Sequence, residues 1–194
     1  MSDDTAFRPA VRADAAVLAE LVNEAGEGIP LYLWDRMKEP GESAWDVGRR
    51  RAARDEGAFS WRNATMIERA GKAAGCLIGY GIADEPEPIP DDFPPMFRPL
   101  QELENLAPGT WYVNVLAVLP AHRNRGLGAK LLQRAEETGR AEGRRGMSII
   151  VSDANAGARR LYERVGYHTA AERPMVKEGW VNEGHRWVLL TKAF

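Results

Sequence analysis

The sequence has a single cysteine, no long apolar run and no excess of either charge. Cys76 alone cannot form an intramolecular disulfide, and its apolar surroundings favour a packed thiol over a nucleophile. No apolar stretch approaches the roughly 20 residues that a membrane span needs. The acidic Met1–Ala10 segment also lacks the apolar region of a signal peptide. We therefore expect a cytoplasmic protein with no membrane partner.

The balance of charge limits the classes of partner. Lys and Arg total 26 against 28 for Asp and Glu, a formal net charge of -2, so no global basic excess draws the chain to nucleic acid. The three histidines have no metal-ligand spacing, and we expect no metal site. Any anion site must be local.

What is present is the composition of an ordinary globular protein. The chain is 44% hydrophobic and 28% charged, which is enough apolar material for a packed core. No low-complexity linker separates its periodic segments, so we expect one domain over residues 1–194.

Apolar periodicity predicts a mixture of strands and helices. The expected strands and helices are a strand at 7–10 followed by a helix, a hairpin at 65–68 and 75–82, a strand at 111–119, a helix at 126–142, a strand at 147–151, a helix after Asn155, and strands at 167–175 and 185–191. Residues 26–62 suggest irregular amphipathic helices that expose some aromatic side chains. Residues 84–108 contain seven prolines and many acids, and we expect a long loop there.

The most informative segment runs from Val118 to Ala129, where a strand passes through a basic, glycine-containing loop into a helix. A helix start offers unpaired N–H groups and a positive dipole end, and Gly126 and Gly128 carry no Cβ that would hold a phosphate away. Arg123 and Arg125 supply charge beside it. The spacing fits neither a Walker loop, because Gly128 is not followed by Lys and Ser or Thr, nor a dinucleotide-binding fingerprint, which needs a third small residue where Leu131 stands.

Two segments resemble the GCN5-related N-acetyltransferase (GNAT) superfamily. Arg123-Asn124-Arg125-Gly126-Leu127-Gly128 matches the family pattern Arg/Gln-x-x-Gly-x-Gly/Ala, after a strand and Pro120. Asn155 to Tyr167 is similar to the family segment Asn-x-x-Ala-x-x-Leu/Phe-Tyr-x-x-x-Gly-Phe/Tyr. The resemblance implies an α/β (α+β) fold with a mixed, mostly antiparallel central sheet, a parallel strand pair splayed around an acyl-CoA cleft, and flanking helices.

The resemblance also implies a cofactor, acetyl-CoA, and a site for it. The pantetheine arm would pair with backbone at Leu116, Ala117 and Val118, and Asn155 would lie near the thioester. The pyrophosphate would lie over the backbone of the loop and the helix start. The implied loop contacts are Arg123, Asn124, Arg125, Gly126, Leu127, Gly128 and Ala129.

Tyr162 occupies the position of the family's general acid, which would give a proton to the departing CoA thiolate. Tyr112 and Asn114 share a strand face with Val118, so they are candidates for lining the acceptor pocket. No carboxylate lies on that strand. The general base therefore stays open between a water chain, Glu24 or Glu27, and a distant acid such as Glu102 or Glu104.

The leading hypothesis is transfer of an acetyl group to a primary amine of a small molecule, by direct transfer in a ternary complex. Two alternatives stay open: a protein N-terminal or lysine acetyltransferase, and a non-catalytic acyl-CoA-binding module. Homodimers are common in the family, although the sequence carries no dimerisation signature.

Overall fold

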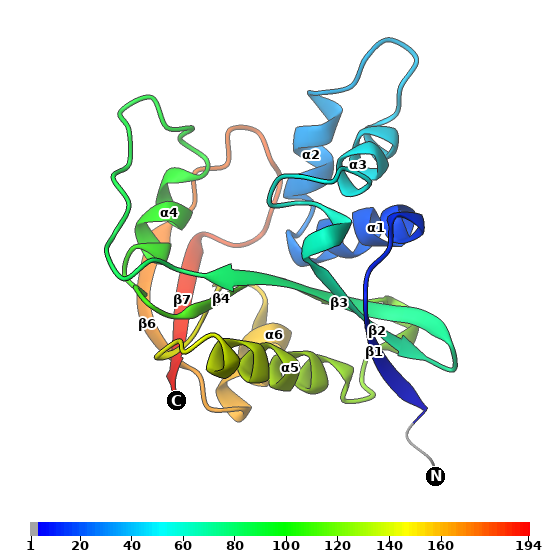
Figure 1. Ribbon diagram of the computed structural model, residues 1–194. Coiled ribbons are helices and arrows are strands. Elements are labelled where there is room, and N and C mark those ends of the chain that lie inside the picture. Colours follow the sequence, from blue (N-terminus) through cyan, green and yellow to red (C-terminus); the bar gives the residue numbers. More distant parts are fainter. Residues whose placement is uncertain (1–3) are drawn as a thin grey trace. The chain divides into compact units, whose positions relative to one another are not determined.

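A computed structural model describes residues 4–194; the first three residues of the Met1–Ala10 segment lie outside the described part (Figure 1). The elements are β1 (Thr5–Pro9), η1 (Arg12–Asp14), α1 (Ala15–Ala25), α2 (Ile29–Asp35), α3 (Ala44–Ala52), η2 (Trp61–Asn63), β2 (Ala64–Arg69), β3 (Lys72–Gly81), α4 (Arg98–Glu104), β4 (Trp111–Val118), η3 (Pro120–His122), α5 (Leu127–Ala141), β5 (Gly146–Ser152), α6 (Ala156–Arg164), β6 (His168–Pro174) and β7 (Arg186–Ala193). They divide into two compact units, the first formed by residues 1–78 and 115–131 and the second by residues 79–114 and 132–194.

Seven strands within residues 4–194 follow the hydrogen-bonded order β1-β2-β3-β4-β5-β7-β6. The pairs β1–β2, β2–β3, β5–β7 and β6–β7 are antiparallel, whereas β4 and β5 are parallel. Paired residues in β4 and β5 run from Trp111 opposite Met147 to Val113 opposite Ile149. Since α5 connects these two strands, their parallel direction follows from the crossover. The predicted mixed, mostly antiparallel fold class is confirmed.

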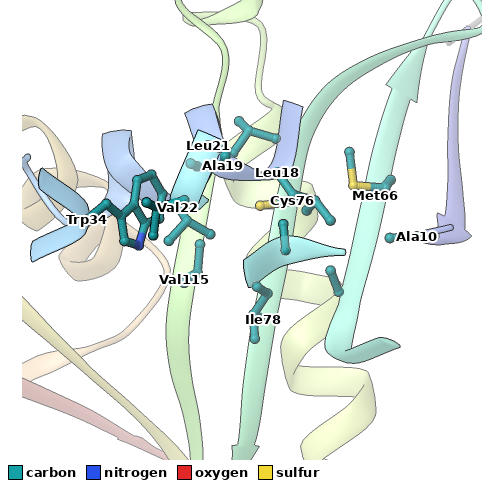
Figure 2. Close-up of a cluster of buried hydrophobic side chains, with 14 residues drawn as sticks. Ala10, Leu18, Ala19, Leu21, Val22, Trp34, Met66, Cys76, Ile78 and Val115 are labelled. Atoms are coloured by element: carbon teal, nitrogen blue, oxygen red, sulfur yellow. The ribbon is translucent and has the colours of Figure 1, made fainter. Parts of the chain in front are cut away.

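The first unit has a core that α1, α2 and α3 share with β2, β3 and the end of β4. Figure 2 shows Leu18, Val22, Trp34, Cys76 and Val115 among the side chains that converge there. Trp34 is only 3% exposed and its ring lies against Trp45 and Phe59. The sequence predicts that this segment exposes some of its aromatic side chains, and Trp34 is not one of them. Complete burial raises the pKa of the Cys76 thiol to about 12, which keeps it unreactive.

Gly48 in α3 provides a stability test of this packing. A Cβ at this position would meet the six-membered ring of Trp34. A helical Gly→Ala change normally stabilises by up to about 1 kcal/mol, but overpacking costs about 1–3 kcal/mol. We expect Gly48→Ala to lower the unfolding midpoint in urea. Gly157→Ala in α6 is the matched control, because its nearest neighbour would be the Asn155 Oδ1 atom at 3.9 Å; equal midpoints for the two variants would contradict the packing argument.

The second unit contains α4, which lies beside β6 and β7 (Figure 1). This helix falls inside residues 84–108, where the sequence predicts a loop, so that prediction is wrong for residues 98–104. Pro99 stands in the first turn of α4, where a missing N–H costs no intrahelical hydrogen bond. The proline that argues against regular structure is thus compatible with a helix start.

No helix among residues 4–194 combines the length and the apolar character needed to span a bilayer. The same residues contain no group of three or more His, Cys, Asp or Glu side chains placed to bind a metal ion.

Candidate active site

The loop between β4 and α5 has the backbone geometry of an anion site. The described φ angles are +59° at Asn124 and +77° at Gly126, so two left-handed residues alternate with ordinary ones just before α5 begins at Leu127. Such alternation turns successive N–H groups toward one side and forms a concavity for an anion. Residues 123–126 are exposed, whereas Leu127 is buried and anchors the helix start.

The space in front of Gly126 is open. A Cβ built at Gly126 would have no other atom within 4 Å. The positive φ favours glycine, and the free volume leaves room for a phosphate beside the backbone. Gly128 and Ala129 lie in the first turn of α5 and are half-buried. The loop residues fit the pyrophosphate that the sequence predicts for them.

The two arginines of this loop differ in a way that the sequence does not reveal. The Arg123 Nε donates to the Val118 carbonyl at 3.1 Å, and its Nη2 lies 2.5 Å from the Glu24 carboxylate. Arg125 is exposed and forms no hydrogen bond or ion pair with any of residues 4–194. Arg125 is therefore available to an incoming anion, while Arg123 ties the loop to β4 and α1.

Glu24 competes with any anion for Arg123. We expect Glu24→Gln to strengthen CoA binding by about two- to fivefold, since exposed ion pairs contribute about 0.2–1 kcal/mol. Isothermal titration with CoA measures the change. Glu20→Gln on the same helix is the control. A weaker affinity in Glu24→Gln would mean that the Glu24–Arg123 pair positions the loop instead of competing for it.

The end of β4 has one buried and one more accessible face. Ala117 is buried in the first unit's core, while Leu116 and Val118 are half-buried on the other side. Gly75 permits this close packing, because a Cβ there would lie 2.5 Å from the Ala117 carbonyl oxygen. The sequence predicts that a pantetheine arm pairs with the backbone of this segment at Leu116, Ala117 and Val118.

In the second unit, α6 carries the other predicted residues. Asn155 caps α6, because its Oδ1 accepts a hydrogen bond from the Ala158 N–H at 3.1 Å. Gly166, with φ +98°, ends the helix and turns the chain so that Tyr167 lies beside Tyr162. Their ring centroids are 6.0 Å apart, and both side chains are at most 5% exposed. Tyr162 is therefore buried against the ring of Tyr167.

Tyr112 and Asn114 occupy the same face of β4, but their surroundings differ. Asn114 is exposed, whereas Tyr112 is 5% exposed and lies under Tyr80, with ring centroids 5.4 Å apart. Burial raises the pKa of Tyr112, and the nearby Glu104, Tyr80 and Tyr162 raise it further. Tyr112 is therefore within electrostatic reach of both Glu104 and Tyr162.

The four acids considered as general bases differ in their positions and in the side chains they contact. Glu24 pairs with Arg123, and Glu102 pairs with Arg173 at 2.8 Å. Glu27 follows α1 at φ +51°. Glu104 instead accepts a hydrogen bond from the Tyr80 hydroxyl at 2.9 Å. The sequence does not predict the contact between Tyr80 and Glu104. Glu104 lies on α4, and the prolines around this helix lead to the prediction of a loop.

The exposed loop before α5 and the capped helix α6 are the two segments that carry the resemblance to acetyltransferases. The acetyltransferase (GNAT) family model matches residues 30–167. The chain belongs to this family of acyltransferases.

Solved structures share the fold at low sequence identity. An acetyltransferase structure is 24% identical, with a TM-score of 0.68, covering 97% of this chain and 98% of the other. An N-acetyltransferase from Staphylococcus aureus Mu50 is 20% identical, with a TM-score of 0.64, covering 96% and 99%. A GNAT family acetyltransferase from Elizabethkingia anophelis, solved with acetyl-CoA bound, is 14% identical, with a TM-score of 0.63, covering 100% of both chains. No curated protein matches the sequence significantly.

Proposed function

We propose that the chain, acting as one domain, transfers the acetyl group of acetyl-CoA to a primary amine of a small molecule. The observation that carries this proposal is the open, exposed loop from Arg123 to Gly126, whose two left-handed residues precede α5. Its N–H groups suit a pyrophosphate, and Arg125 adds an unpaired positive charge. The E. anophelis neighbour, which has the same fold, was solved with acetyl-CoA.

The proposed placement of acetyl-CoA uses the residues predicted to bind the cofactor and the predicted general acid. The pyrophosphate lies on the backbone from Arg123 to Ala129, and the pantetheine arm pairs with backbone from Leu116 to Val118. Asn155 and Tyr162 lie near the thioester. The composition of the chain supports a cytoplasmic reaction, and a homodimer remains a prediction.

The proposed chemistry is direct transfer within a ternary complex. The neutral amine attacks the thioester carbonyl carbon, a C–N bond forms and the C–S bond breaks. Tyr162 gives its hydroxyl proton to the departing sulfur, so free CoA leaves as the thiol. The nitrogen loses one proton to solvent as the amide forms, and Tyr162 recovers one proton from solvent.

A thiol-release assay with acetyl-CoA and a panel of amines tests the proposal. The panel contains small amines, a peptide with a free N-terminus and a lysine-containing peptide. Release with a small amine supports the proposal, and release with peptides alone would identify a protein acceptor. Acetyl-CoA binding without any amine-dependent release would identify a non-catalytic binding module.

A further inference from the structure

Glu104 stands at a point of accumulated negative charge. It is the last residue of α4, where the helix dipole places its negative end. Burial raises the pKa of Glu104, and the charge of a second carboxylate, Glu87, raises it further. The Glu87 segment is fixed beside α4, because Asn105 bonds the Glu87 N–H at 3.1 Å and the Glu87 carbonyl at 2.8 Å.

No positive side chain compensates this charge. Among residues 4–194, neither Glu104 nor Glu87 forms an ion pair. Arg173 of β6, a strand that packs against α4, is paired with Glu102. The hydrogen bond from Tyr80 lowers the pKa of Glu104 but brings no positive charge to it. A half-buried carboxylate without a cationic partner is a favourable position for a cation from outside the chain.

Aromatic rings line the same place. The rings of Tyr80 and Tyr112 are tilted by 59° with centroids 5.4 Å apart, and Tyr80 is 39% exposed. Aromatic faces attract ammonium groups. The charge of Tyr162 affects Tyr112 as well. Glu104, Tyr80, Tyr112 and the proposed general acid Tyr162 all belong to the second compact unit.

We infer that Glu104, with Glu87 and Tyr80 beside it, binds the ammonium group of the acceptor and removes its proton before acetyl transfer. The acceptor class follows from the charge: two carboxylates attract a cationic amine and repel one with a carboxylate of its own. The inference rests on the proposed function, since it assigns the base and the acceptor class for that reaction.

The proton transfers balance. The ammonium gives one proton to the Glu104 carboxylate, and the neutral amine forms the C–N bond. The nitrogen loses its second proton as the amide forms, while Tyr162 protonates the sulfur and is reprotonated in turn. One proton is released overall, when Glu104 returns to its carboxylate form in solvent.

Glu104→Gln tests the base. We expect kcat/KM for the amine to fall by about a hundredfold or more, as for loss of a general base, with CoA affinity unchanged. Because the pKa of Glu104 is raised above its usual 4.5, the wild-type rate should decline on the acid side at a higher pH than for an ordinary glutamate. The titratable or charged groups around it are Tyr80, Tyr112, Glu87 and the Glu102–Arg173 pair. Glu104→Gln should lose this acid limb, whereas Asp92→Asn, which changes an exposed acid of the same 84–108 segment, should keep both the limb and the rate.

Direct binding separates this inference from the proposed function. Cadaverine and lysine differ only in a carboxylate, and each is titrated calorimetrically into the CoA-loaded protein. We expect cadaverine to bind at least about tenfold more tightly than lysine, and Glu104→Gln to remove this preference. That result without thiol release would uphold the cation site and refute the transferase. Thiol release that is unchanged in Glu104→Gln, or equal binding of both amines, would overturn the inference and leave the transferase intact.

Discussion

Replacing Tyr162 by phenylalanine is expected to lower kcat for amine-dependent CoA release by about a hundredfold or more, the usual contribution of a general acid. The change deletes one hydroxyl and keeps the ring that packs against Tyr167. The pyrophosphate loop is untouched, so KM for acetyl-CoA should change little. A loss confined to kcat means that the hydroxyl acts in the transition state and not in cofactor binding.

Tyr167→Phe is a close control for this prediction. Tyr167 is 4% exposed, contacts the ring of Tyr162 and would lose the same hydroxyl. Steady-state kinetics with acetyl-CoA and the best amine of the panel should show near wild-type kcat for Tyr167→Phe. Equal losses in both variants would attribute the effect to disturbed packing, and an unchanged kcat in Tyr162→Phe would remove Tyr162 from the mechanism.

The parts of the fold that the sequence predicts best are those where backbone chemistry and periodicity agree. The strand predicted at 111–119 and the helix predicted at 126–142 are confirmed as β4 (Trp111–Val118) and α5 (Leu127–Ala141), where an apolar run, a glycine-containing turn and a helical stripe follow one another. The buried stripe of α5 has helical spacing and consists of Leu127, Leu131, Leu132 and Ala135, all at most 3% exposed. Local sequence determines these features, so they can be read without tertiary information.

The parts that it misses depend on contacts distant in sequence. Trp34 is buried because Gly48 leaves room for its ring. No local sequence pattern predicts that these two residues pack together. The different states of Arg123 and Arg125 depend on Glu24, about 100 residues away in the chain. Glu104 is distinguished from Glu102 only by Tyr80 and Arg173, which belong to two different strands. The sequence therefore identifies the candidate cofactor loop, whereas the choice of Glu104 among the candidate bases requires the structure.

A negative charge at Gly126 should weaken acetyl-CoA binding more than any other single change in the loop. Any side chain here meets the strain of φ +77°, about 1–2 kcal/mol, so the strain must be separated from the charge. Gly126→Ala carries the strain alone, and Gly126→Asp adds a carboxylate where the phosphates are expected. Two like charges about 4 Å apart repel by about 1–4 kcal/mol at a protein surface. We expect Gly126→Asp to bind about ten- to a hundredfold more weakly than Gly126→Ala.

Salt distinguishes this repulsion from a damaged loop. Screening weakens interactions between exposed charges as ionic strength rises, so the difference between the Asp and Ala variants should shrink between low and high salt. A backbone distortion would give a difference that salt does not change. Equal affinities for Gly126→Ala and Gly126→Asp at low salt would place the pyrophosphate elsewhere. In that case the open space in front of Gly126 would no longer support an acetyl-CoA site at the start of α5.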